Sequence, residues 1–236
     1  AILATGSELV EIGKKPGPGQ IRNSNSYALA AQSLDAGASF AYLGIAADDP
    51  QSLAQKVVSG LAADVLLLSG GVSVGDRDIV PDVLAGAGVE ILFHKVAMKP
   101  GRPVLFGKKG TCLVFGLPGN PVSAFVGFEV FVRPVLAHLV GDPAIARAWV
   151  SLPLAEDVDV VTDRTWFAPA RVDRDVEGNG TVALVQSRGS ADIPALSRGN
   201  ALAVFPGETA TYRKGTRVRT ILLGDVGFVS STGGGR

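Results

Sequence analysis

The sequence contains few of the side chains that build most zinc sites and disulfide frameworks. Among its 236 residues there is one cysteine, Cys112, and there are two histidines, His94 and His138. A single cysteine excludes an intramolecular disulfide, and three such side chains are too few for the usual His/Cys zinc site. The sequence also has no Walker-type loop and no Gly-x-Gly-x-x-Gly that opens a helix, which argues against two common nucleotide-binding fingerprints.

The chain also has no excess of charge of either sign. Lysine plus arginine and aspartate plus glutamate each number 22, so the formal net charge is zero. Such a chain has no general attraction for nucleic acid or for an acidic membrane surface, so we expect neither as a partner. The most apolar long stretch, Val122–Val140, carries Glu129 and Arg133, and these charges favour a core helix over a membrane span. We therefore expect a soluble, cytoplasmic protein whose partner is a small molecule.

Glycine is abundant, with 30 residues, and three glycines follow the most apolar short run of the chain. Val65–Leu68 has no polar position, as expected for a strand that is buried on both faces of a parallel sheet. It continues into Ser69–Asp78, which contains serines, glycines and two aspartates. One interpretation is a ligand-binding loop, because ligands in open α/β sheets bind beyond the carboxyl ends of the strands. The alternative is an ordinary turn in which Asp78 caps the next helix.

Strand-like and helix-like segments alternate over residues 1–143. We expect strands near 1–4, 38–46, 65–68, 89–93, 104–107 and 111–115, and helices near 26–36, 52–61, 79–87 and 121–140. This alternation predicts an α/β domain with a doubly wound, mostly parallel sheet.

The pattern changes in the second part of the chain. Over residues 147–224, short runs rich in valine, threonine and leucine are separated by Gly, Asn, Asp and Pro; the runs are Val150–Leu154, Thr165–Val172, Thr181–Val185, Ala201–Phe205 and Arg217–Leu223. This predicts a small all-β domain, a barrel or a sandwich. Residues 225–236 are expected to form a disordered tail.

Four polar loops are expected at one edge of the α/β sheet. Right-handed crossovers place loops 5–9, 48–49, 69–78 and 116–121 beyond the same strand ends. With the neighbouring loop 95–103, they bring together acids, bases and small hydrogen-bond donors. The acids are Glu8, Asp48, Asp49, Asp76 and Asp78, the bases are Lys95, Lys99 and Arg102, and the small donors are Ser7, Ser69, Ser73 and Ser123.

The chemistry of these side chains points to an anionic ligand. Carboxylates suit Mg²⁺, which often joins a substrate phosphate, and lysines can offset the charge of an oxyanion. The N-terminus of a helix that begins near Pro121 would add a partial positive charge. The loops therefore predict a site for a phosphate-bearing ligand that is bridged by a metal. Each acid taken singly could instead be a helix cap or a solvated loop charge.

Several stretches, in their order along the chain, resemble one family. They are Thr5-Gly6-Ser7-Glu8-Leu9, the helix-cap residues Asn23-Ser24-Asn25, Ser69-Gly70-Gly71-Val72-Ser73-Val74-Gly75-Asp76, Lys99-Pro100-Gly101-Arg102-Pro103 and Gly116-Leu117-Pro118-Gly119-Asn120-Pro121-Val122-Ser123-Ala124. Together they resemble the molybdopterin molybdenumtransferases, the MoeA family, which includes the E domain of gephyrin. Ser187–Ser190 and Arg198–Ala201 match a family pattern more weakly. The stretch Gly116–Ala124 is the most specific of these, because Thr5–Leu9 and Ser69–Ser73 are shared with molybdopterin adenylyltransferases and CinA-like proteins.

The resemblance implies an enzyme of molybdenum cofactor biosynthesis. Such an enzyme takes adenylated molybdopterin, releases AMP with the help of Mg²⁺, and inserts molybdate. The implied catalytic residues are Glu8, Asp78, Lys95 and Lys99, and the implied metal ligands are Asp48, Asp49 and Asp78. The implied cofactor-binding residues are Thr5, Gly6, Ser7, Ser69, Gly70, Gly71, Ser73, Gly75, Asp76, Arg102, Pro118, Gly119, Asn120, Pro121 and Ser123.

The sequence departs from the family pattern at two places. Ser7 stands where the family often has aspartate, which removes a negative charge beside Glu8. Phe167-Ala168-Pro169 stands where a Phe-x-Arg element is expected, so Arg164 or Arg171 would have to bind the oxyanion.

The resemblance also bears on the extent of the protein. Family members carry two further domains upstream and form the active site between two subunits. The strand-like start at Ala1–Ala4 then suggests the C-terminal portion of a longer protein. In that form we expect a homodimer, with a molybdopterin adenylyltransferase as a candidate partner.

Two other functions remain open from the sequence. The stretches shared with other families would also suit a molybdopterin adenylyltransferase or a CinA-like nucleotide hydrolase, although Gly116–Ser123 and the β domain argue against these. A non-catalytic assembly module is the other alternative, since the E domain of gephyrin also anchors receptors.

Overall fold

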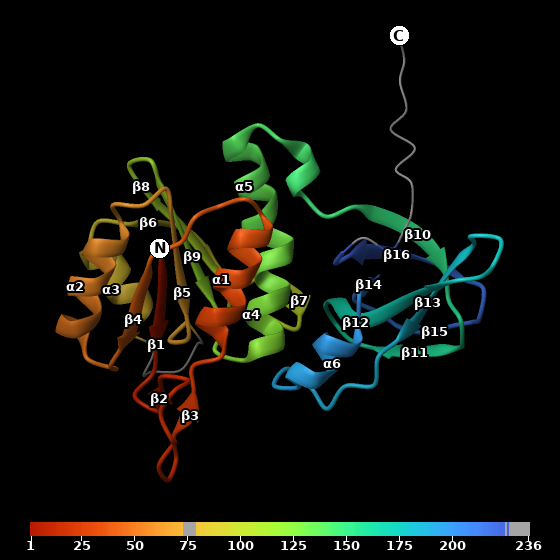
Figure 1. Cartoon of the computed structure of the whole chain (residues 1–236), viewed down its shortest axis with the longest axis horizontal. Helices are drawn as coiled ribbons and strands as arrows, with labels where there is room; N and C mark the ends of the chain where they lie inside the picture. The colour runs from red at the N-terminus through yellow and green to blue at the C-terminus, as the bar shows by residue number, and fades with distance from the viewer. Residues whose placement is uncertain (73–78, 225, 227–236) are drawn as a thin grey trace. The chain divides into compact units, whose positions relative to one another are not determined.

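The computed structural model describes residues 1–72, 79–224 and 226. The chain divides into two compact units, one made of residues 1–146 and 189–192 and the other of residues 147–188 and 193–236. The segment 189–192 therefore packs with the first unit, although it lies within the range that the sequence analysis gave to the β domain. Figure 1 shows the elements of both units.

Six strands form the main sheet of the first unit. They are β1 (Ile2–Thr5), β4 (Tyr42–Ala46), β5 (Val65–Ser69), β6 (Glu90–His94), β8 (Leu105–Lys109) and β9 (Cys112–Leu117), in the order β4-β1-β5-β9-β8-β6. β1 pairs in parallel with β4 and β5, and β5 pairs in parallel with β9, whereas β8 is antiparallel to both of its neighbours. The prediction of a mostly parallel sheet is confirmed. Every residue of β5 is buried, as its unbroken apolar run requires.

Helices cover both faces of this sheet. The first three are α1 (Asn25–Asp35), α2 (Pro50–Gly60) and α3 (Val80–Gly86). Figure 1 places α2 and α3 on one face and α1 and α4 (Pro121–Gly127) on the other. On the first face, Leu3 and Leu66 of the sheet share a buried cluster with Leu53 of α2 and Leu84 of α3. This is the doubly wound arrangement that the alternating segments predicted.

One expected strand is shorter than predicted. The strand near 38–46 begins only at Tyr42. Gly37 has φ +76°, and the Ala38 N–H donates to the Ser33 carbonyl oxygen over 3.0 Å. These residues therefore complete the C-terminal end of α1. Three two-residue strands are too short to leave a periodic pattern and were not predicted: β2 (Leu9–Val10), β3 (Ile21–Arg22) and β7 (Met98–Lys99).

The last long helix of the first unit has three parts and is followed by a short 3₁₀ turn (Pro143–Ile145). α4 (Pro121–Gly127) leads into a π-helical turn (Phe128–Val132), and α5 (Arg133–Val140) follows. By length and composition this helix could cross a membrane, yet 56% of its most apolar window is buried inside the protein. Its Glu129 and Arg133 side chains are buried and paired, with 2.7 Å between Glu129 Oε2 and Arg133 Nε. These features fit the core helix predicted for Val122–Val140.

The second unit is built on a five-stranded antiparallel sheet. Its strands are β10 (Trp149–Pro153), β12 (Thr165–Arg174), β13 (Gly180–Leu184), β14 (Ala201–Phe205) and β16 (Arg217–Leu222), in the order β10-β16-β14-β12-β13. A bridge between Leu154 and Val182 joins the two ends of the sheet, and the Ala155 N–H donates to the Val182 carbonyl oxygen over 2.9 Å. The sheet thus closes into a barrel around a buried cluster that includes Leu152 and Phe205, which confirms the all-β prediction.

The sequence analysis missed three elements of the second unit. They are β11 (Val158–Val161), α6 (Ile193–Arg198) and β15 (Thr209–Tyr212). β11 and β15 pair only with each other among the described residues, and runs of four residues flanked by charges give a weak signal. Apart from residue 226, the expected tail 225–236 lies outside the described residues.

Asp157 ties two loops of the barrel unit together, and we expect its contribution to stability to depend on pH. Its carboxylate accepts hydrogen bonds from the Lys214 N–H and from Nη1 of Arg213, both over 2.7 Å. The Lys214 N–H first, and then the Arg213 guanidinium, hold the pKa of Asp157 below its ordinary value of 3.8. A lowered pKa stabilises the folded state fully above that ordinary value, and the contribution is lost as the pH falls through the folded value.

Replacement of Asp157 with asparagine should therefore lower the melting temperature at pH 7, and the difference from wild type should disappear under strongly acidic conditions. Tryptophan fluorescence can follow the melt, because both tryptophans, Trp149 and Trp166, belong to this unit. Asp173→Asn is the matched control, since Asp173 makes one exposed ion pair with Arg171 and should contribute little. A difference that is the same at every pH would contradict the prediction.

Candidate functional site at the carboxyl edge of the sheet

The loops that follow β1, β4, β5 and β9 are joined at the carboxyl edge of the parallel strands. The Gly6 N–H, after β1, donates to the carbonyl oxygen of Ala46 at the end of β4 over 3.2 Å. The Gly70 N–H, after β5, donates to the Leu117 carbonyl oxygen at the end of β9 over 3.0 Å. The convergence that was predicted from right-handed crossovers is therefore present in the described part of these loops.

Ser69–Val72, the glycine turn, packs closely against Thr5 at the end of β1. Gly70 has φ +94°, and a Cβ atom at this position would lie 2.4 Å from the Thr5 carbonyl oxygen. Gly71 has φ +63°, and a Cβ there would lie 2.7 Å from both Thr5 Oγ1 and Val80 Cγ2. Only glycine fits either position.

Thr5 Oγ1 lies against this turn and is buried. It makes no hydrogen bond within the described residues, and Thr5 as a whole is only 5% exposed. A buried hydroxyl without a partner is costly. Since the atom lies beside two glycines that leave the backbone bare, a ligand that reached the turn could supply the missing partner.

Of the three acids predicted as metal ligands, the structure describes Asp48 and Asp49, and the carboxylate of each accepts a hydrogen bond from a backbone N–H. Asp48 Oδ2 accepts a hydrogen bond from the Ser7 N–H over 2.9 Å, and Ser7 Oγ accepts one from the Asp48 N–H over 3.2 Å. Asp49 Oδ2 caps α2 by accepting from the Ser52 N–H over 2.8 Å, so the helix-cap alternative holds for this acid. Glu8 is exposed, and its carboxylate folds over Gly6. In residues 1–72, 79–224 and 226, no group of three or more His, Cys, Asp or Glu side chains could hold a metal ion.

Four of the predicted site residues lie outside the described part of the chain: Ser73, Gly75, Asp76 and Asp78. Val72, the residue before Ser73, is held by a side chain of β6. Nε2 of His94, at the end of β6, lies 2.9 Å from the Val72 carbonyl oxygen. Because a carbonyl oxygen accepts, the His94 ring donates this hydrogen bond through an Nε2–H.

The basic loop (Lys95–Pro103) contains Lys95, Lys99 and Arg102, and all three side chains are exposed. Lys95 has φ +93°, a conformation that non-glycine residues rarely adopt outside functional sites. A Cβ on Gly101 would lie 3.5 Å from the Ser123 carbonyl oxygen. The basic loop therefore packs beside the start of α4.

The proline loop (Gly116–Ser123) is fixed from two directions. From one side, the Asn25 side chain donates to the Gly119 carbonyl oxygen over 2.8 Å. From the other, Ser190 Oγ accepts from Asn120 Nδ2 over 2.9 Å, and the Ser190 carbonyl oxygen accepts from the Val122 N–H over 3.0 Å. The amide of Asn120, a predicted cofactor-binding residue, is thus used to hold the loop. Pro118 and Ser123 are buried, whereas Pro121 opens α4.

Sequence reasoning did not assign a role to Asn25 or Ser190. Asn25 attracted attention only as a helix cap, yet Ser24 is the N-cap residue and Asn25 donates away from its own helix. Ser190 belongs to the weak family match at Ser187–Ser190. For both residues, the one signal in the sequence was that they belong to a stretch that resembles the family. The local pattern cannot show a contact with a loop that is 70 or more residues away.

A polar cluster around Tyr42 holds the chain beside β2 and β3, which pair with each other. The Tyr42 hydroxyl donates to Glu11 Oε1 over 2.8 Å and accepts from Asn23 Nδ2 over 2.8 Å. Tyr27 reaches the second carboxylate oxygen of Glu11. Partial burial, and then the neighbouring Glu11 carboxylate, raise the pKa of Tyr42 to about 12, so the hydroxyl keeps its proton at physiological pH. The cluster fixes the path of the chain from Glu8 back to α1.

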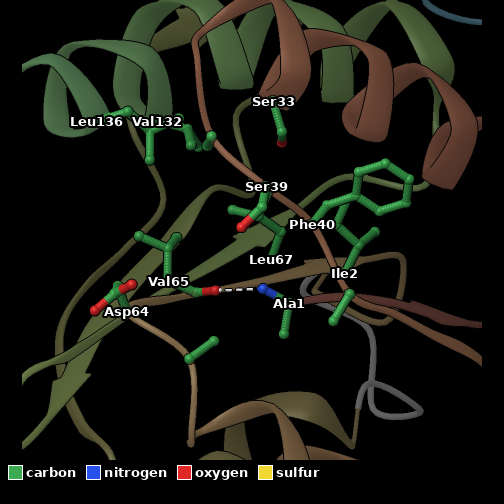
Figure 2. A pocket seen from close by; sticks show the side chains of 13 residues that line it. Ala1, Ile2, Ser33, Ser39, Phe40, Asp64, Val65, Leu67, Val132 and Leu136 are labelled. Carbon is green, nitrogen blue, oxygen red and sulfur yellow. Dashed lines mark hydrogen bonds between the residues drawn. The ribbon is translucent and has the colours of Figure 1, made fainter. Parts of the chain in front are cut away.

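A cavity of about 240 Å³ lies at the opposite, amino-terminal edge of the same sheet (Figure 2). Phe40, Val65, Val132 and Leu136 line it, with Ser39 and Asp64 among the polar groups. None of the predicted site residues that the structure describes is in its lining. The cavity is therefore distinct from the loops at the carboxyl edge.

Two family descriptions match the chain in order. Residues 1–138 match the "Probable molybdopterin binding domain" family, and residues 151–223 match the "MoeA C-terminal region (domain IV)". The chain belongs to the MoeA family. The resemblance that the sequence analysis drew from its loop stretches is thus confirmed.

Individual MoeA relatives agree in sequence and fold. The molybdopterin molybdenumtransferase of Bacillus subtilis is 35% identical over 223 residues, covering 94% of this chain and 52% of its own length. That of Staphylococcus aureus strain Mu50 is 32% identical, with 94% of this chain and 53% of its own length covered. The crystal structure of the molybdopterin biosynthesis MoeA protein from Pyrococcus horikosii superposes with a TM-score of 0.79 at 27% identity, covering 94% of this chain and 54% of that one. The chain spans about half the length of these MoeA proteins.

Proposed function

We propose that this chain is the pterin-binding and C-terminal portion of a molybdenumtransferase of molybdenum cofactor biosynthesis. The proposed reaction inserts molybdate into adenylated molybdopterin and releases AMP. One observation carries the proposal: the glycine turn and the proline loop are joined at one sheet edge, in a chain that matches both family descriptions in order.

The pterin and its phosphates would bind between the glycine turn and the proline loop. Gly70 and Gly71 leave the backbone open to close approach, and Ser69 and Ser123 offer small hydroxyls. The unpartnered hydroxyl of Thr5 would gain a hydrogen bond from the ligand. A buried hydroxyl without a hydrogen bond costs roughly 1–3 kcal/mol, and a hydrogen bond from the ligand would remove this cost. The Thr5 hydroxyl therefore supports a polar ligand group at this place.

The basic loop would neutralise molybdate and phosphate. Lys95, Lys99 and Arg102 are exposed on one short segment, where their charges can face an anion. The positive φ of Lys95 supports a functional role, because backbone strain of roughly 1–3 kcal/mol persists where the surrounding structure requires that conformation.

The donor set suits Mg²⁺ in its chemistry, since all the candidate ligands are hard carboxylate oxygens. Asp48 and Glu8 are exposed at the carboxyl edge, and Oδ1 of Asp48 has no hydrogen bond within the described residues. Asp49 is a poorer candidate because one of its oxygens caps α2. We propose Asp78 as a further ligand. Bound Mg²⁺ would neutralise charge at the phosphate bridge of the substrate.

The wider setting is also a proposal. The match of residues 151–223 to the C-terminal region of MoeA favours this function over a molybdopterin adenylyltransferase or a CinA-like hydrolase. We propose that the full-length protein works in the cytoplasm as a homodimer, and that a molybdopterin adenylyltransferase supplies its substrate.

Titration with adenylated molybdopterin in the presence of Mg²⁺ tests the binding site. We expect the wild-type chain to bind, and Lys99→Ala to bind roughly ten- to a hundredfold more weakly, the value of one hydrogen bond to a charged group. Lys108→Ala is the matched control, because Lys108 lies on the β8 hairpin and pairs with Glu90 at the surface. Absence of binding by the wild-type chain, or full binding by an Asp78→Ala/Lys99→Ala variant, would exclude the proposed site.

A further inference from the structure

Asn25 is the first residue of α1 and only 9% exposed. Its Nδ2 donates to Ser69 Oγ over 2.9 Å and to the Gly119 carbonyl oxygen over 2.8 Å. Both amide hydrogens are therefore used, one on the glycine turn and the other on the proline loop. These partners are 44 and 94 residues away in the sequence.

The Asn25 side chain is not needed to cap α1. Ser24 occupies the N-cap position, and Asn23 Oδ1 accepts from the Ser26 N–H over 3.2 Å, so the first turn of the helix is served by a neighbour. The Asn25 side chain makes no hydrogen bond with the backbone of α1. Its two hydrogen bonds serve the loops rather than the helix.

The helix that carries Asn25 is itself fixed. At its far end, Gln32 Nε2 donates to Glu129 Oε1 over 2.8 Å and to the Phe125 carbonyl oxygen over 3.2 Å. The Leu29 side chain is fully buried between these points. The two loops share one direct hydrogen bond, from the Gly70 N–H to the Leu117 carbonyl oxygen. A short amide on this fixed helix can add to it by holding Ser69 and Gly119, which make no hydrogen bond to each other within the described residues.

We propose that Asn25 is a positioning residue that fixes the spacing between the glycine turn and the proline loop. The link to ligand binding rests on the proposed function, since the pterin is placed between these two loops. The role requires two donors on a short side chain. Aspartate has the same shape but no donor, and its carboxylate would face the Gly119 carbonyl oxygen, so Asn25→Asp should release the loops.

Hydrogen–deuterium exchange of the ligand-free chain tests the positioning role. In Asn25→Asp we expect the amides of residues 69–71 and 119–124 to exchange roughly tenfold faster, because loss of a hydrogen-bonded tie opens the loops locally. Gln32→Leu is the matched control: it removes a buried amide with two hydrogen bonds from the same helix, and should speed exchange in α1 and α4 without favouring those loop residues.

A second readout separates positioning from the proposed function. Adenylated molybdopterin should bind Asn25→Asp about tenfold more weakly than wild type, with an unchanged circular dichroism spectrum. If Asn25→Asp does not fold, Asn25→Ser, which keeps one donor, replaces it. Exchange that rises by the same factor throughout the chain would overturn the positioning role. Lack of binding by wild type, with the selective exchange still present, would overturn the proposed function alone.

Discussion

Replacement of Arg133 with methionine is expected to lower the free energy of unfolding of the first unit by about 3–5 kcal/mol. Arg133 is 1% exposed. It contacts Glu129 Oε2 through Nε over 2.7 Å and Asp35 Oδ2 through Nη2 over 2.8 Å. Methionine would fill most of the space but would leave the fully buried Glu129 carboxylate without its cation. An unpaired buried charge costs far more than the net value of the pair.

Urea unfolding followed by the helical circular dichroism signal would measure this loss, because nearly all helices belong to the first unit. The double variant Glu129→Leu/Arg133→Met should recover much of the stability, since it removes both charges. Lys108→Met is a surface control: the pair between Lys108 and Glu90 is exposed, and its loss should cost about 0–1 kcal/mol. Equal losses in the buried and surface variants would show that the buried pair is not needed.

Gly70→Ala is expected to destabilise the first unit by about 3 kcal/mol and to abolish pterin binding. A positive φ costs an L-residue roughly 1–2 kcal/mol, and overlap in a packed site adds roughly 1–3 kcal/mol. The overlap here is with backbone, since the added Cβ would lie 2.4 Å from the Thr5 carbonyl oxygen. Relief requires movement of β5 away from β1, which widens the edge where the ligand is proposed to bind.

Gly37→Ala separates the cost of the positive φ from the cost of the steric overlap. Gly37 has φ +76° and no atom within 4 Å of its added Cβ, so it should lose only about 1 kcal/mol. Urea unfolding and pterin titration would compare the two variants. If Gly70→Ala were no less stable than Gly37→Ala and bound the pterin normally, the close contact between the glycine turn and β1 would not matter for the site.

The local patterns of the chain were sufficient for most of the first unit. Val65–Leu68 is apolar at every position, and a strand without a polar face must be covered on both sides. That requirement, with the alternation of helices, gave the parallel strands and hence the shared edge of the loops. The barrel unit was predicted as a class, but β11 and β15 were missed because runs of four residues carry little periodic signal.

The candidate site was predicted less completely than the fold. The loops meet at the predicted edge, and the roles of the individual acids and lysines there remain predictions. Asp49 was expected as a metal ligand from its residue type, and the structure adds that one of its oxygens caps α2. Asn25 shows the opposite case. Its sequence context suggested a helix cap, yet its side chain donates to two loops that are far away in the sequence.

The sequence by itself determined the family, the two-part architecture and the edge at which the functional loops gather. These follow from short-range patterns of apolar and turn-forming residues, and from stretches that are specific in their order. Only the tertiary structure decided which side chains hold the loops: Asn25 between Ser69 and Gly119, Ser190 on Asn120, and His94 on Val72. The reason is that a hydrogen bond between residues far apart in the chain depends on the packing of whole helices and strands, which no local pattern encodes.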